Sequence, residues 1–322
     1  MLIPGSLKRC LFVLWLPTLL GAAEPEPLNV PTTLLSVTSM PEVSGIVWNA
    51  QLGRYLVVSD DTGIKENGTN HAPWLFSISP EGAFDPAPIP IVGLPKLNDA
   101  EAICEGPDGT YFVATSHSEN RKGKHKGERR RLYHLKLVGR NLHILGSVEL
   151  SQAIVESKAI DGDSLDMEAL AFRQGVLYVG LKAPQTTSGE AIILRVKGFQ
   201  AGLQSGQIPK HAIDRFATIP LIVESTSNQE KVRQGISDMC FLADGSLLLL
   251  GNSPKKHPPD GGGALWLRKI DGSVSLLKRF PGLKPEGISL NDKKSSLLIV
   301  FDNDRKLPMW QRIPLPKTER QP

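Results

Sequence analysis

Carboxylate side chains recur at the first position of short repeated units along the chain. Each unit begins with an acidic or small polar residue, continues with a small or apolar and then an aliphatic residue, and leads through a turn into a hydrophobic strand. Carboxylates that gather in one place raise one another's pKa unless a cation or an arginine separates them. Five units share this pattern, and their first residues are Ser44, Glu101, Glu168, Asp238 and Glu286.

This acidic ring has two interpretations. Ca²⁺ is a hard cation with about six to eight oxygen ligands, which makes the carboxylates of Glu101, Glu168, Asp238 and Glu286 candidate metal ligands. In the alternative, each carboxylate accepts hydrogen bonds from backbone N–H groups of the next unit and fixes the spacing of the units. Because the position recurs in every unit, the repetition favours the structural role. The sequence leaves both open.

A second set of polar residues follows the second strand of each unit and differs from one unit to the next. A ligand lacks the symmetry of a repeated scaffold, so variation at equivalent positions is typical of a binding site. Turn capping after a strand is the alternative. The set consists of Asp60, Ser116, Lys182, Asn252 and Asp302.

A basic loop, residues 121–131, lies directly after Ser116 and His117. Its arginines can hold a phosphate or carboxylate ligand, although a solvated charged loop is the alternative. His117 suits a general base, with Asp60, Asp302 or a metal-bound water as partners, although an isolated histidine is more often an ordinary hydrogen-bonding residue. The candidate catalytic residues are therefore His117, Asp60 and Asp302. The candidate substrate-binding residues are Ser116, Lys182, Asn252, Arg129, Arg130 and Arg131.

The elements that position these residues are short strands. The repeated units begin 48 to 70 residues apart, and Asp108-Gly109 and Asp244-Gly245 are typical hairpin dipeptides between the first and second strands of two of them. Further short strands bring each unit to four. The pattern predicts an all-β fold, a β-propeller of five four-stranded blades, with a short helix over Ser151 to Ser157.

Two features of the propeller stay open at this point. The last unit has three strands, so we expect residues 32–38, after the N-terminal segment, to supply the fourth and close the ring without an exposed edge. A propeller of six blades is the alternative if residues 192–223 fold as a degenerate unit instead of the outer strands of the third blade.

The N-terminus reads as a signal peptide. Lys8 and Arg9 precede an apolar stretch from Leu11 to Leu20, and small residues end the segment at Ala23. The apolar stretch is about half the length that spans a bilayer, so we expect cleavage, no integral membrane segment afterwards and a periplasmic or secreted protein. Residues 24–322 then form a single propeller domain.

Composition excludes some partners. Removing residues 1–23 takes away Lys8 and Arg9 and no acidic side chain, so the formal net charge falls from +4 to +2, which is not typical of a nucleic-acid-binding protein. Two cysteines are left, Cys104 and Cys240. Cys104 stands one position later in its unit than Cys240 does, which predicts that the two face opposite sides and form no disulfide.

Several segments together resemble the family called domain of unknown function 3616. They are residues 99–103 (DAEAI), 115–124 (TSHSENRKGK), 128–132 (ERRRL), 167–171 (MEALA), 178–184 (YVGLKAP), 284–288 (KPEGI) and 300–304 (VFDND). The resemblance spans nearly all of the chain after the signal peptide and implies a propeller without assigning an activity. Where the family tends to have arginine in the Gly-Leu-x-x-Pro segment, this chain has Lys182.

Two hypotheses for function follow. In the first, the chain is a metal-assisted hydrolase, with Ca²⁺ as the candidate metal, that acts on a small anionic ester, lactone or phosphate at the mouth of the channel. In the second, it is a binding or assembly module that holds a protein or anionic partner with the basic loop. No motif of a serine hydrolase, zinc protease or phosphate-binding loop is present, which leaves the second hypothesis open.

Overall fold

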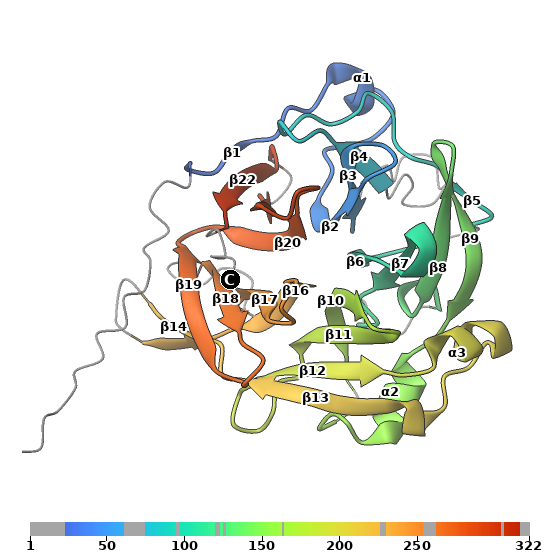
Figure 1. Cartoon of the computed structure of the whole chain (residues 1–322), viewed down its shortest axis with the longest axis vertical. Coiled ribbons are helices and arrows are strands. Elements are labelled where there is room, and N and C mark those ends of the chain that lie inside the picture. The colour runs from blue at the N-terminus through green and yellow to red at the C-terminus, as the bar shows by residue number, and fades with distance from the viewer. Residues whose placement is uncertain are drawn as a thin grey trace, which may run out of the picture.

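The computed structural model describes residues 23–60, 75–94, 97–119, 123–124, 127–162, 164–225, 230–253, 262–303 and 306–315. Within these residues, five antiparallel sheets stand around a central axis (Figure 1). The predicted five-bladed β-propeller is confirmed. The innermost strands of the blades are β2 (Val43–Asn49), β6 (Ala100–Glu105), β10 (Asp166–Arg173), β16 (Gly235–Phe241) and β20 (Lys284–Leu290).

The other strands follow outward in chain order in each blade. They are β3 (Arg54–Ser59) and β4 (Leu75–Ile78) in the first, β7 (Thr110–Thr115), β8 (Leu132–Val138) and β9 (Asn141–Val148) in the second, β11 (Val176–Ala183), β12 (Ala191–Val196) and β13 (Ile213–Ile219) in the third, β17 (Leu247–Asn252), β18 (Gly263–Arg268) and β19 (Val274–Phe280) in the fourth, and β21 (Ser296–Asp302) and β22 (Met309–Pro314) in the fifth.

The count of four strands per blade is wrong for the first blade. Among the described residues its sheet contains three strands, and the strand that follows it, β5 (Ile91–Val92), instead pairs in parallel with β9 of the second blade. Residues 192–223 form no sixth blade. They supply β12, β13 and most of β14 (Ile222–Glu224), which makes a two-stranded ribbon with β15 (Lys231–Arg233).

An N-terminal strand closes the ring, but from different residues than expected. Strand β1 (Glu26–Pro27) pairs with β22, and the next residue, Leu28, donates its N–H to the carbonyl oxygen of Pro308 at 2.8 Å. Residues 32–35 instead form a helical turn, α1 (Thr32–Leu35), which starts after Pro31. Pro31 is the N-cap of this turn and is itself extended, with φ of −69° and ψ of 144°, so the chain changes from extended to helical backbone directly after it.

Each innermost strand contains a β-bulge, where one residue is skipped in the pairing with the second strand. The skipped residues are Ser44, Glu101, Glu168, Ser237 and Glu286. In the fourth blade the bulge is therefore at Ser237, so the assignment of Asp238 to the acidic position is wrong by one residue. With this correction Cys104 and Cys240 occupy equivalent positions, and both are free thiols, as expected, although not for the predicted reason.

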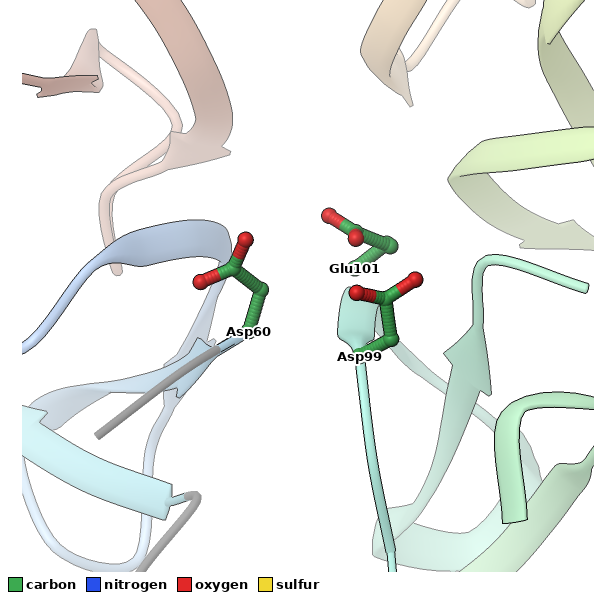
Figure 2. A group of neighbouring side chains, drawn as sticks. All are labelled: Asp60, Asp99 and Glu101. Carbon is green, nitrogen blue, oxygen red and sulfur yellow. The ribbon is translucent and has the colours of Figure 1, made fainter. Parts of the chain in front are cut away.

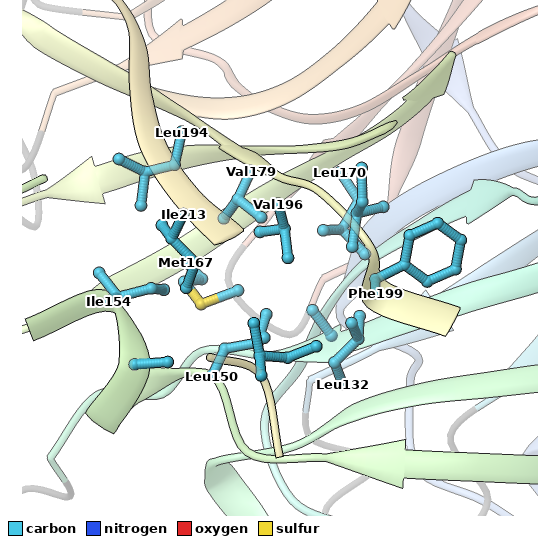
Figure 3. Close-up of a cluster of buried hydrophobic side chains, with 14 of the residues drawn as sticks. Leu132, Leu150, Ile154, Met167, Leu170, Val179, Leu194, Val196, Phe199 and Ile213 are labelled. Atoms are coloured by element: carbon cyan, nitrogen blue, oxygen red, sulfur yellow. The ribbon is translucent and has the colours of Figure 1, made fainter. Parts of the chain in front are cut away.

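The core lies between neighbouring blades. The cluster between the second and third blades packs Leu132, Met167 and Val179 against the predicted helix α2 (Ser151–Ser157) and against α3 (Phe199–Ser205) (Figure 3). The described residues also include three short 3-10 helices, η1 (Pro107–Gly109), η2 (Gly127–Arg129) and η3 (Lys210–Ala212). None of the described helices has the length and apolar character needed to cross a bilayer.

Candidate functional site at the channel mouth

The bulges turn carboxylates toward one end of the channel, where lysines neutralise two of them. Lys182 Nζ lies 2.5 Å from Glu168 Oε1, and Lys284 Nζ lies 2.6 Å from Glu286 Oε1 and 3.0 Å from Asp302 Oδ2. Burial works against the charged form of Lys182, but the charges of Glu168 and Glu286 outweigh it and raise the pKa of this lysine. The third and fifth blades therefore carry their own counter-charges. Bulges are common next to active sites because they redirect a side chain.

Three carboxylates of the first and second blades form a tighter group (Figure 2). Asp60 follows β3, Asp99 precedes β6, and Glu101 is the bulge residue of β6. One oxygen from each lies within 4.8 Å of the others. Two unit charges at this distance repel by roughly 3 kcal/mol at an effective dielectric constant of about 20. The group is costly in its ionised form without a cation.

The electrostatics of the group agree with this cost. Burial, followed by the charges of Asp99, Glu168 and Asp60, raises the pKa of Glu101 well above its ordinary value. Burial, followed by the charges of Glu42 and Asp99, does the same to the pKa of Asp60. Asp99 also has a left-handed backbone with φ of 64°, which is uncommon outside glycine and often occurs at functional sites.

Three buried polar atoms around the channel mouth have no hydrogen-bond partner among the described residues. Two are acceptors, Asp60 Oδ1 and Glu168 Oε2, and one is a donor, Arg129 Nε. The other side of the same guanidinium contacts Asp99 Oδ2, and its Nη2 donates to Ser118 Oγ at 2.9 Å. A buried polar group without a partner costs about 1–3 kcal/mol. The acceptors suit a cation and the donor suits an anionic oxygen.

The four predicted metal ligands separate into three environments. Glu101 belongs to the three-carboxylate group, whereas Glu168 and Glu286 each pair with a lysine. Asp238 is 1% exposed and lies inside the wall, where its oxygens accept the N–H groups of Met239 and Ile288, both at 2.8 Å. Because Ile288 lies in the next blade, Asp238 plays the structural role that the sequence left open.

The varied residues at the ends of the second strands also separate. Asp60 lies in the carboxylate group and Lys182 beside Glu168, while Ser116 Oγ lies 2.9 Å from Ser118 Oγ. Asn252 is buried, and its Nδ2 donates to the carbonyl oxygen of Pro285 at 2.7 Å, which links the fourth and fifth blades. Asp302 pairs with Lys284 and is not part of the group around Asp60.

His117 does not join these carboxylates. Its ring is 1% exposed, and its Nδ1 lies 2.7 Å from the carbonyl oxygen of Thr115. Burial lowers the pKa of His117 to about 4, and the charged groups that act on the ring are Glu149, Arg130 and Arg131. The structure thus does not bring together the predicted catalytic set of His117, Asp60 and Asp302.

The three consecutive arginines point to different partners. Arg129 reaches the channel mouth, where it contacts Asp99. Arg130 pairs with Glu149 at 2.9 Å and donates to Ser151 Oγ at 2.9 Å, next to α2. Arg131 lines a separate cavity beside Glu149. Only the first of them can act at the channel mouth. Residues 121–122 and 125–126 of the basic loop lie outside the described residues.

Lys284 is the main site residue that the sequence analysis missed, and Asp99 was not singled out as a site residue either. Both stand two positions before a bulge, where side chains of a strand face the same side. A comparison of this position among the units reveals the same blade-to-blade variation that identified the second-strand residues. The equivalent residues are Glu42, Asp99, Asp166, Gly235 and Lys284.

No family model matches the chain, and no curated protein matches it either. Among solved structures, it is similar to a hypothetical protein from Leishmania major (9% identity, TM-score 0.48, 92% of this chain and 91% of that one). It is also similar to a gluconolactonase from Xanthomonas campestris (14%, 0.40, 92% and 99%) and to a putative glycosidase from Bacteroides thetaiotaomicron (11%, 0.48, 87% and 88%). We rest neither the fold nor the function on likenesses of this degree.

Proposed function

We propose that the protein is a metal-assisted hydrolase that acts on a small anionic ester, lactone or phosphate at the channel mouth. The observation that carries the proposal is the group of Asp60, Asp99 and Glu101, whose oxygens lie within 4.8 Å of one another. Carboxylate oxygens are the ligands that hard divalent cations prefer, and Ca²⁺ accepts the irregular geometry of such a group. The unpartnered Oδ1 of Asp60 supports the same assignment.

The charges of the group explain how an anionic substrate can approach. Asp60, Asp99 and Glu101 carry three negative charges when ionised, and Arg129 supplies one positive charge. A divalent cation brings the sum to zero and removes the repulsion of a substrate anion. When bound, the cation supplies Lewis acidity, which polarises a carbonyl or phosphoryl oxygen and lowers the pKa of water.

The residues of this chain that bind the anionic part are Arg129, Lys182 and Lys284. The Nε of Arg129 is a buried donor that a substrate oxygen can satisfy. The two lysines lie in the third and fifth blades, beside Glu168 and Glu286. Burial opposes their charged form, but the neighbouring carboxylate charges outweigh it and raise the pKa of both lysines. Asp302 holds Lys284 in place at 3.0 Å.

The proposal also includes export and family. The signal peptide predicted in residues 1–23 is the basis for a periplasmic or secreted protein, and all of it except Ala23 lies outside the described residues. The motifs described in the sequence analysis are the basis for membership of the domain of unknown function 3616 family. Neither point is needed for the chemistry at the channel mouth.

Hydrolysis assays test the proposal. The protein is assayed with Ca²⁺ and with a chelator against nitrophenyl esters and lactones, each in an anionic and a neutral form, and against phosphate monoesters, which are anionic at neutral pH. We expect Ca²⁺-dependent hydrolysis of an anionic substrate and a drop in kcat/KM of roughly 100-fold in Asp60→Asn. Glu105→Gln, an exposed carboxylate at the far end of the same strand as Glu101, is the matched control and keeps full activity.

A second variant tests the anion-binding role separately. Arg129→Lys keeps a positive charge beside Asp99 but removes the Nε donor and the planar fork. We expect KM for the anionic substrate to rise about 10-fold with kcat little changed, and KM for the neutral substrate to stay the same. Absence of hydrolysis in all three substrate classes with Ca²⁺ bound, or equal activity in Asp60→Asn, would overturn the proposal.

A further inference from the structure

A polar cavity lies beside α2 and away from the channel mouth. Figure 1 shows α2 at the outer rim of the propeller. The volume of the cavity is about 380 Å³, which lies within the usual range for small-molecule sites of roughly 300–1,000 Å³. It opens between α2 and the loop that leads into η3. The residues that line it are Arg131, Glu149, Gln152, Ala153, Glu156, Gly206, Gln207, Ile208, Pro209 and Lys210.

Two cations of the lining have no counter-charge. Neither the guanidinium of Arg131 nor the ammonium group of Lys210 forms an ion pair or a side-chain hydrogen bond with any described residue. The neighbouring Arg130, by contrast, is occupied by Glu149 and Ser151. Guanidinium groups recognise carboxylates through two parallel hydrogen bonds, so Arg131 and Lys210 together suit a carboxylate ligand.

The acidic residues of the lining further restrict the chemical class of ligand that the cavity can bind. Glu149 is balanced by Arg130 at 2.9 Å, whereas Glu156 accepts a hydrogen bond only from the neutral amide of Gln152, at 2.8 Å, among the described residues. The cavity therefore has uncompensated charges of both signs. A dianion such as phosphate would be repelled by Glu156, but a molecule with an ammonium group as well as a carboxylate satisfies all three residues.

We propose that this cavity binds a small zwitterion, of the size of an amino acid or a dipeptide, with its carboxylate on Arg131 and Lys210 and its ammonium group on Glu156. The site is independent of the proposed hydrolase site, because none of its lining residues belongs to the channel mouth. It gives a role to Arg131, which lies outside the proposed hydrolase site.

Isothermal titration of the full chain tests this site. The probes are glycine, glutamate, arginine and glycylglycine, with succinate as a carboxylate without an ammonium group and inorganic phosphate as a dianion. We expect saturable binding of at least one zwitterion, tighter than that of succinate or phosphate. We expect Arg131→Met and Lys210→Met each to weaken binding of the zwitterion about 10-fold. Glu156→Gln should weaken binding of the zwitterion but not binding of succinate.

The controls separate binding from folding. Lys210 is exposed, so Lys210→Met keeps the melting temperature and stays informative if Arg131→Met does not fold. Lys136→Met, an exposed lysine on β8 in the strand that follows Arg131, leaves binding unchanged. No saturable binding of any zwitterion, or equal affinity in Lys210→Met and the wild type, overturns the proposal. Either result leaves the Ca²⁺-dependent activity at the channel mouth untouched.

Discussion

At the residue scale, carboxylates near the start of different repeated units have different roles. Asp238 lies inside the wall and accepts two backbone N–H groups, whereas Glu101 faces the channel beside two further carboxylates. The difference comes from a shift of one residue relative to the bulge, which exchanges a channel-facing position for a buried one. Whether a carboxylate near the start of a unit is structural or functional therefore depends on its position relative to the bulge. It does not depend on whether the residue is Asp or Glu.

The structural role of Asp238 gives a stability prediction. Asp238→Ala leaves the N–H groups of Met239 and Ile288 buried without an acceptor, so we expect the free energy of unfolding to fall by about 2–4 kcal/mol. The affinity for Ca²⁺ stays the same because Asp238 is not a ligand. Urea unfolding and calcium titration of one preparation measure both quantities. Asp271→Ala, at an exposed aspartate, is the control. An equally small change in unfolding free energy in both variants would refute the structural role of Asp238.

The three-carboxylate group gives a pH prediction. The folded-state pKa values of Asp60 and Glu101 are raised from ordinary values of 3.8 and 4.5, mainly by burial, so the folded protein holds these protons more tightly than the unfolded chain. The stability that they contribute is complete below about pH 4 and is lost as the pH rises through the raised values.

In chelator, we therefore expect the melting temperature to fall as the pH rises above about 4.5, the ordinary pKa of Glu101, and through the raised pKa values of both carboxyls. Ca²⁺ should restore it at the upper end, because the ionised oxygens then have a counter-charge. Scanning calorimetry across this range, with and without Ca²⁺, provides the measurement. A melting temperature that rises with pH in chelator would contradict the assignment.

At the element scale, the sequence pattern predicts the blades well and their closure poorly. The innermost and second strands follow from hydrophobic runs and hairpin dipeptides, and α2 falls on the predicted residues. The closing strand is only Glu26–Pro27, too short and too rich in proline to show a strand pattern. The bulges have no hydrophobic signature either, which is why Asp238 was aligned in place of Ser237.

The closing strand gives a prediction for the element. Leu28, directly after β1, is 1% exposed, whereas Val37, which lies in the segment first expected to close the ring, is 51% exposed. We expect Leu28→Ala to lower the free energy of unfolding by about 2–4 kcal/mol and Val37→Ala to change it by less than about 0.5 kcal/mol. Denaturant unfolding of the two variants compares them directly. A larger loss of unfolding free energy in Val37→Ala than in Leu28→Ala would mean that residues 32–38 supply the closing strand.

At the scale of the whole molecule, a nearly symmetric scaffold carries an asymmetric set of charges. The first and second blades place carboxylates at the channel mouth without a lysine, and the third and fifth blades place Lys182 and Lys284 beside their own carboxylates. The fourth blade offers Gly235, Ser237 and Asn252 at the equivalent positions. The division into an acidic side and a lysine-bearing side follows from the register of all five blades together, so no single motif reveals it.

The most direct test of the account is a calorimetric titration of the metal-free full chain with Ca²⁺. The account predicts one binding site per chain, release of protons at neutral pH, and loss of binding in Asp60→Asn but not in Glu105→Gln. Absence of binding, or binding of equal affinity in Asp60→Asn, would contradict the assignment of Asp60, Asp99 and Glu101 as a metal site and with it the proposed hydrolase.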